Sequence, residues 1–161
     1  LTRRGLMACL EMHFRSRTAG SAHLMMVDID HFKRINDTHG HQMGDLVLGR
    51  VAQVLQATAR KGDLICRLGG EEFLVVALDI EPAGAFQLAE RLREAISYSE
   101  VPSLSAQGPI RCTVTIGVSQ GFSHPQALDA VLQQADAALY RGKESGRDRV
   151  ESAFAPLPLP A

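Results

Sequence analysis

"RLGGEEFLVV", residues 67–76, places two glycines and two glutamates between two apolar runs. The runs 64–68 and 73–78 have the length and composition of strands, and the glycines supply the positive φ angles that a tight turn requires. The segment therefore predicts a β-hairpin with Glu71 and Glu72 at its tip. An exposed acidic turn is the ordinary explanation of such a pair, but the glycines and the closely flanking strands favour a ligand site.

A second strand precedes the hairpin in the chain. Residues 24–27, LMMV, are apolar without alternation, as expected of a strand buried on both faces. Asp28 and Asp30 come at its end, before HFKRINDTHGHQMGD, which predicts a short helix and a glycine-rich bend.

Helical spacing of apolar residues recurs in four further segments. The predicted helices are 4–17, 46–59, a helix opened by Pro82 and Gly84, and one with its apolar stripe over 128–139. Residues 101–109 predict a loop, and 110–121 predict a strand with alternation around 113–118. This order predicts an α/β (α+β) fold with helices on a mixed sheet. We expect one domain over residues 1–152 and a proline-rich disordered tail over 153–161.

Composition narrows the classes of function. The 161 residues are 45% hydrophobic and carry a net charge of −1, which gives no basic surface for nucleic acid or for an anionic membrane. No apolar run approaches the ~20 residues of a membrane span. Three widely spaced cysteines indicate reduced thiols and a cytoplasmic domain. Because the chain begins with Leu1, we expect it to be part of a longer protein that could itself be membrane-anchored.

Asp28 at the strand end, together with the backbone N–H groups of His31, Phe32 and Lys33, predicts a site for a phosphate and its cation. Helix capping by Asp28 and Asp30 is the alternative explanation. If the hairpin lies beside this strand, three acids converge, and a divalent cation is needed to offset their repulsion.

Three blocks of sequence resemble the signature blocks of the GGDEF family, the diguanylate cyclases. They are VDIDHFKRINDTHGHQMGD at 27–45, GGEEF at 69–73 and ADAALYRGKESGRDRV at 135–150. The resemblance implies a mixed five-stranded sheet with a palm-like βααββαβ core. It also implies a bacterial signalling enzyme that condenses two GTP into cyclic di-GMP and pyrophosphate.

The resemblance implies a role for each matching position. Mg²⁺ (or Mn²⁺), two ions per active site, would be held by Asp28, the carbonyl of Ile29 and Glu71, with Glu72 close by and both glutamates catalytic. Phosphates would meet Phe32, Lys33, Lys143 and Arg147, whereas guanine would be read by Asn36 and Asp45, with His41 near the pocket. Without the resemblance, Asn36 is a helix-end residue and Asp45 the N-cap of a helix starting at Leu46.

Arg60 and Asp63 in RKGD match the family's inhibitory RxxD site for cyclic di-GMP, and Arg67 matches a further arginine there. A charged turn is the alternative.

Because the product needs two GTP, the resemblance implies a homodimer, which family members obtain through an upstream sensory domain. The signature block at the start of the family's domain is reduced to LTRRGL in this chain, and Asp148 stands where the family usually has Asn. There are two competing hypotheses. The chain is a catalytically silent receptor for GTP or cyclic di-GMP, or it is another nucleotidyl cyclase or polymerase palm.

Overall fold

The computed structural model describes residues 1–16, 18–103 and 108–154. Five strands form one mixed sheet in the order β2-β3-β1-β4-β5, with antiparallel pairs except for the parallel pair β4–β5. The elements are α1 (Arg3–Phe14), β1 (His23–Ile29), α2 (Phe32–His39), α3 (His41–Thr58), β2 (Leu64–Gly69), β3 (Glu72–Ala77), α4 (Pro82–Tyr98), β4 (Val114–Val118), the 3₁₀ turn η1 (Pro125–Ala127), α5 (Leu128–Glu144) and β5 (Arg149–Ser152).

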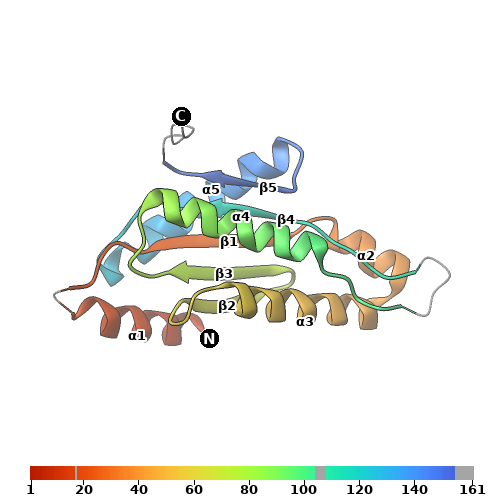
Figure 1. Ribbon diagram of the computed structural model, residues 1–161, viewed down its shortest axis with the longest axis horizontal. Helices are drawn as coiled ribbons and strands as arrows, with labels where there is room; N and C mark the ends of the chain where they lie inside the picture. The colour runs from red at the N-terminus through yellow and green to blue at the C-terminus, as the bar shows by residue number, and fades with distance from the viewer. Residues whose placement is uncertain (17, 104–107, 155–161) are drawn as a thin grey trace.

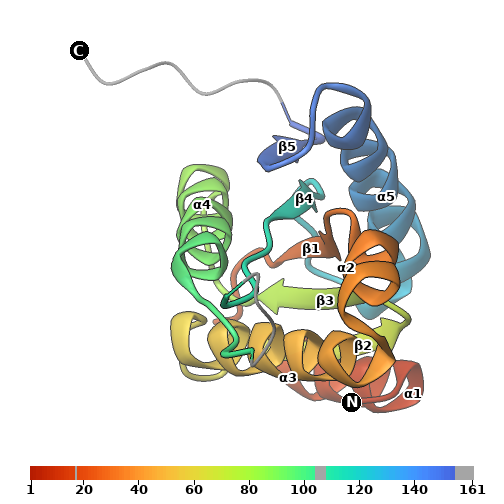
Figure 2. The ribbon, with the colours of Figure 1, turned by 90° about the vertical axis from the view of Figure 1, so that its right-hand side faces the viewer.

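Helices cover both faces of the sheet (Figures 1 and 2). One core lies between the sheet and α3 and α4, where Val27, Val75 and Ile116 meet Val51 and Leu92. A second core lies between the opposite face and α1 and α5. Burial of apolar surface on both faces explains why β1 is buried along its whole length.

The predicted fold class, the hairpin and the buried central strand are confirmed. β5 was missed by the reading of local pattern, because its four residues contain no apolar run and pair only with the distant β4. The predicted start of a helix at Leu46 is wrong: Gly40, with φ of 89°, makes the bend alone, and α3 begins at His41. Asp45 therefore lies inside α3 and is not its N-cap.

The chain ends differ in detail from the prediction. α1 ends at Phe14, earlier than the predicted residue 17. Residues 104–107 of the predicted loop and 155–161 of the predicted tail lie outside the described residues. Phe154, the last described residue, packs on the core and on the ring of His23.

Three segments meet at one end of the sheet, on the right of Figure 1. They are the β2–β3 hairpin tip, the start of α2 after β1, and the turn between α5 and β5. Polar side chains that are far apart in the sequence are thereby gathered at the end of the central strand.

Candidate active site

Two carboxylates face one another at the end of β1. Asp28, which is only 4% exposed, is the register partner of Glu72 on β3. Directly opposed residues of antiparallel strands project from the same face of the sheet, so both side chains lie on the α5 side. Glu71 belongs to the hairpin tip, and its carbonyl accepts from the N–H of Ile29 at 3.2 Å. The predicted convergence of Asp28 and the two glutamates is thus present.

Burial and neighbouring negative charges raise the pKa of both opposed carboxyls. Desolvation is the largest cause of the raised pKa of Asp28, with Glu71 and Asp30 adding to it and Lys143 acting against it. Desolvation followed by the charge of Asp28 raises the pKa of Glu72. The site therefore favours any cation that can stabilise the charged carboxylates.

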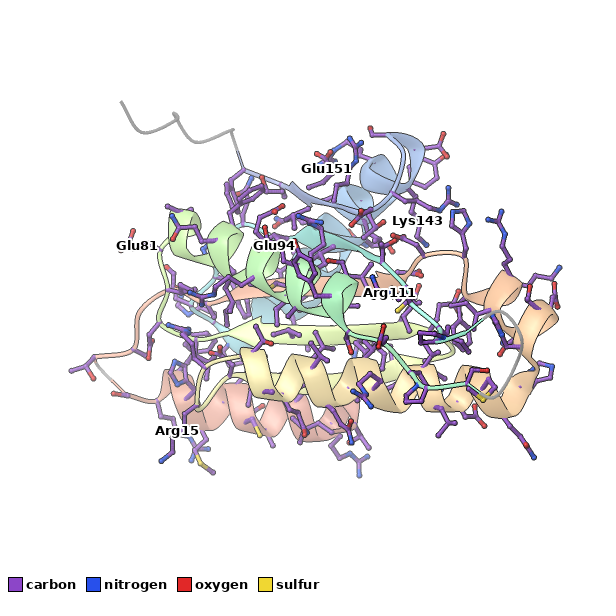
Figure 3. The ribbon with its side chains drawn as sticks, turned by 45° about the vertical axis from the view of Figure 1, so that its right-hand side comes forward. Arg15, Glu81, Glu94, Arg111, Lys143 and Glu151 are labelled. Atoms are coloured by element: carbon purple, nitrogen blue, oxygen red, sulfur yellow. The ribbon has the colours of Figure 1, made fainter. Side chains whose placement is uncertain are left out.

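Lys143 is the cation that the chain itself supplies. Its Nζ donates to Oδ2 of Asp28 at 2.7 Å, from the last turn of α5 (Figure 3). The approach depends on Gly142, because a Cβ there would lie 2.6 Å from the Cγ2 of Thr115. Lys143 was predicted to contact phosphates, and in the chain alone it pairs with the predicted metal ligand.

Arg147 lies in the turn that follows α5. Its backbone is left-handed, with φ of 62°, and its N–H donates to the carbonyl of Gly142 at 3.0 Å. Arg147 is half-buried, and within the described residues no hydrogen bond or ion pair involves its guanidinium. A cation without an acidic partner in the turn after α5 suits an anionic ligand.

The start of α2 leaves backbone donors free. His31 occupies the N-cap with φ of 54° and makes no side-chain cap bond, and neither Asp28 nor Asp30 caps the helix. Within the described chain, the N–H groups of His31, Phe32 and Lys33 have no backbone or side-chain acceptor. The capping alternative is therefore wrong, and the N–H groups remain available to a phosphate. Phe32 is buried, whereas the side chain of Lys33 is exposed.

Asn36 and Asp45 are brought together by the packing of α2 on α3. The amide of Asn36 lies against Gly44, where a Cβ would come within 1.8 Å of its Oδ1. Asp45 is exposed and borders a hollow of about 400 Å³ between α3 and the hairpin. Its other lining residues are Leu48, Gly49, Ala52, Arg67 and Phe73. His41 is exposed at the first turn of α3.

The RxxD residues lie together at the other end of β2. Asp63 is a buried acceptor: it receives the N–H groups of Arg60 and Leu78 and forms an ion pair with Arg60 at 3.1 Å. The side chain of Arg60 stays 39% exposed, against 2% for Asp63. Arg67 is directed elsewhere, because its Nη2 donates to the carbonyl of Gly70 at the hairpin tip.

Sequence reasoning missed the role of two positions, Asp30 and Gly44. Asp30 is buried and accepts from Thr113 and Thr115 at 2.7 and 2.6 Å. Gly44 makes room for Asn36, as described above. The only local signal was the D-x-D spacing of Asp28 and Asp30, which does not distinguish a free carboxylate from one enclosed by hydroxyls.

The donor set suits a cation that is shared with a ligand. Among the described residues, no three acidic, histidine or cysteine side chains form a group that could hold a metal ion. Mg²⁺ takes one or two protein carboxylates and completes its coordination with phosphate oxygens and water. Asp28 and the adjacent glutamates fit that requirement.

The sheet and the acidic end of its central strand define an α+β domain of the palm-like type. The chain belongs to the GGDEF family: the family model described as "Diguanylate cyclase, GGDEF domain" matches residues 2–149.

Known proteins agree with this assignment over most of the chain. "Diguanylate cyclase DgcP" of Pseudomonas aeruginosa is 43% identical over 143 residues, which are 89% of this chain and 21% of that protein. The active GGEEF domain of a diguanylate cyclase from Vibrio cholerae superposes with a TM-score of 0.80 at 31% identity, covering 96% of this chain and 98% of that one. The GGDEF domain of DgcB from Caulobacter crescentus, solved in complex with c-di-GMP, gives 0.79 at 33% identity, covering 92% and 85%.

The chain spans about a third or less of the length of the first curated relatives. No helix in the described part of the chain has the length and apolar character needed to cross a membrane.

Proposed function

We propose that the chain is the catalytic domain of a diguanylate cyclase, which joins two GTP into cyclic di-GMP with release of pyrophosphate. The observation that carries the proposal is Asp28 opposite Glu72 at the open end of β1, with Lys143 bonded to Asp28. A domain that only bound nucleotide would not require the buried, mutually repelling carboxylates.

Asp28, the carbonyl of Ile29 and Glu71 would hold two Mg²⁺ or Mn²⁺ ions, with Glu72 close by. Bound there, the ions would supply Lewis-acid stabilisation of the attacking 3′-oxygen and of charge on the phosphates. The positive charge of the ions would also keep Asp28 and Glu72 ionised, although burial raises the pKa of both carboxyls.

The remaining groups would orient GTP. The free N–H groups at the start of α2, with Lys33, would bind phosphate oxygens, and Arg147 would bind the outer phosphates from the opposite side. When the cations bind Asp28, the ammonium group of Lys143 would leave that carboxylate and bind a phosphate oxygen instead. Positioning of this kind supplies most of the catalysis in phosphoryl and nucleotidyl transfer.

Guanine would lie in the hollow that Asp45 lines and would be read by Asp45 and Asn36. The carboxylate of Asp45 would accept from the two N–H donors of the guanine edge, and Asn36 offers both a donor and an acceptor. Adenine lacks those donors, so it would leave the carboxylate unpaired, at a cost of about 1–3 kcal/mol.

One domain would bind one GTP, so catalysis would require a homodimer with a site between two subunits. We further propose product inhibition at the RxxD turn. The buried Asp63 would brace Arg60, whose exposed guanidinium would bind the phosphate or guanine of cyclic di-GMP. Arg67 donates to the hairpin tip and lines the hollow beside Asp45. Arg67 would therefore lie between the inhibitory site and the active site.

A product assay tests the proposal. The purified chain at high concentration, with and without a fused dimeric coiled coil, is incubated with Mg²⁺ and GTP or ATP. We expect cyclic di-GMP from GTP alone, loss of product in Glu71→Gln and Glu72→Gln, and normal product in Glu11→Gln, an exposed glutamate of α1. No product from the dimerised wild type would refute the enzyme and leave a receptor, whereas product from ATP would indicate a different nucleotidyl cyclase.

A further inference from the structure

The turn that carries Arg147 has an unfavourable backbone. Gly146, Arg147 and Asp148 have φ of 115°, 62° and 46°, so three consecutive residues are left-handed and two of them carry side chains. Such conformations persist only where surrounding contacts hold them. The contacts that hold this turn therefore decide where the guanidinium of Arg147 lies.

Asp30 provides one of these contacts from the end of β1. Its Oδ2 accepts from the N–H of Asp148 at 3.0 Å. The same carboxylate accepts from the hydroxyls of Thr113 and Thr115, at 2.7 and 2.6 Å, and Asp30 is only 5% exposed. These donors engage both oxygens, so Asp30 joins the end of β1, β4 and the turn. Among the described residues, the carboxylate of Asp28 receives Lys143 alone.

Arg93 provides a second contact, from α4. Its Nη1 donates to Oδ1 of Asp148 at 2.9 Å, and its Nη2 pairs with Glu90 at 3.0 Å on the same helix. α4 and β5 are neighbours in the fold, as Figure 2 shows. Asp148 is thereby held through its backbone by Asp30 and through its side chain by Arg93.

We infer that Asp30 and Arg93 are positioning residues, which hold the left-handed turn so that Arg147 faces the phosphates of a nucleotide bound at Asp28. The inference rests on the proposed function for the identity of the ligand. In this inference neither residue contacts the metal or the nucleotide itself. Their removal should therefore weaken contacts to the outer phosphates and leave contacts to the base unchanged.

Four variants test the inference: Asp30→Ala, Asp30→Asn, Arg93→Met and, as a matched control, Glu90→Gln, which removes the charge of another partner of Arg93. Asn at position 30 can keep all three bonds, because its oxygen can accept from Asp148 and Thr113 while its amide donates to Thr115. The measurements are amide exchange of Asp148, and the Kd of GTP and of GMP with Mg²⁺.

We expect faster exchange at Asp148 in Asp30→Ala and in Arg93→Met. The Kd of GTP should rise about tenfold or more in Asp30→Ala and about two- to fivefold in Arg93→Met. The Kd of GMP should change by less than about twofold in both. Asp30→Asn and Glu90→Gln should resemble the wild type, and Arg93→Met keeps the test decisive if Asp30→Ala does not fold.

Unchanged exchange at Asp148 in both Asp30→Ala and Arg93→Met would overturn the inference. So would equal losses of GTP and GMP affinity, or an Asp30→Asn protein as defective as Asp30→Ala, which would indicate direct metal binding by Asp30. A wild type that binds no GTP would refute the proposed function instead, and the exchange rates alone would then decide whether the two residues hold the turn.

Discussion

Replacing Lys143 with Met should destabilise the chain in a manner that depends on pH. The variant loses the 2.7 Å bond to Asp28, which leaves a buried carboxylate beside Glu72 without a cation. A hydrogen bond to a charged group contributes about 1.5–3 kcal/mol. Because the Lys143 side chain is 32% exposed, we take the lower part of that range, about 1.5–2 kcal/mol. For a domain of this size the loss corresponds to a Tm lower by about 3–8 °C at neutral pH.

The sign of the pH dependence follows from the raised pKa of Asp28. In the wild type, burial favours the protonated carboxyl, so the free energy of unfolding falls as pH rises from the ordinary value toward the raised one. Lys143 opposes this shift, and its loss raises the pKa of Asp28 further. The stability difference between the wild type and Lys143→Met should therefore be small in acid and grow as pH rises to neutrality.

Thermal unfolding of the metal-free chain from pH 4.5 to pH 8 measures this difference. Lys61→Met, at an exposed lysine of the RxxD turn, is the matched control and should not change the Tm. Asp28→Asn removes the charge that needs a partner, so Lys143→Met should cost little in that background. A Tm difference that is constant with pH, or that persists in the Asp28→Asn background, would show that Lys143 stabilises by packing and not by pairing with the carboxylate.

Three shorter predictions concern the nucleotide sites. Gly44→Ala should displace the amide of Asn36 and raise the Kd of GTP by about tenfold, with the fold retained by circular dichroism; unchanged affinity would remove Asn36 from the base site. Asp45→Ala should lower kcat/KM for GTP by about 10–100-fold without a matching loss for ATP, and equal losses would argue against base recognition. Arg60→Ala should leave the initial rate unchanged and abolish inhibition by added cyclic di-GMP; retained inhibition would place the inhibitory site elsewhere.

Local patterns predicted the parts of the fold that local forces determine. The hairpin was predictable because Gly69 and Gly70 were required at its tip, where both have positive φ. The central strand was predictable because a strand covered on both faces is apolar throughout. The start of α3 was predicted wrongly, because Gly44 looked like part of a bend; it lies within the helix, where its lack of a side chain accommodates Asn36.

Long-range contacts were outside the reach of the sequence. β5 depends on a parallel pairing with β4, and four residues carry too little pattern to predict it. The convergence of Asp28, Glu71 and Glu72 could be predicted from motifs, but the different environments of Asp28 and Asp30 could not. Those environments arise from Lys143, Thr113 and Thr115, which are more than 80 residues away in the chain.

Under the proposed function, the charges of the site favour a nucleotide that arrives together with its cations. Asp28, Glu71 and Glu72 bring three negative charges, against which Lys143 and Arg147 bring two positive ones. A nucleoside triphosphate carries about as much negative charge as two divalent cations carry positive charge, so the complex leaves this balance unchanged. Free nucleotide would add its full charge to the carboxylates, and metal alone would compete with Lys143 for Asp28. Under the proposed function, the contact between Lys143 and Asp28 thus couples cation binding to phosphate binding, since each group gains its new partner only when both ligands are present.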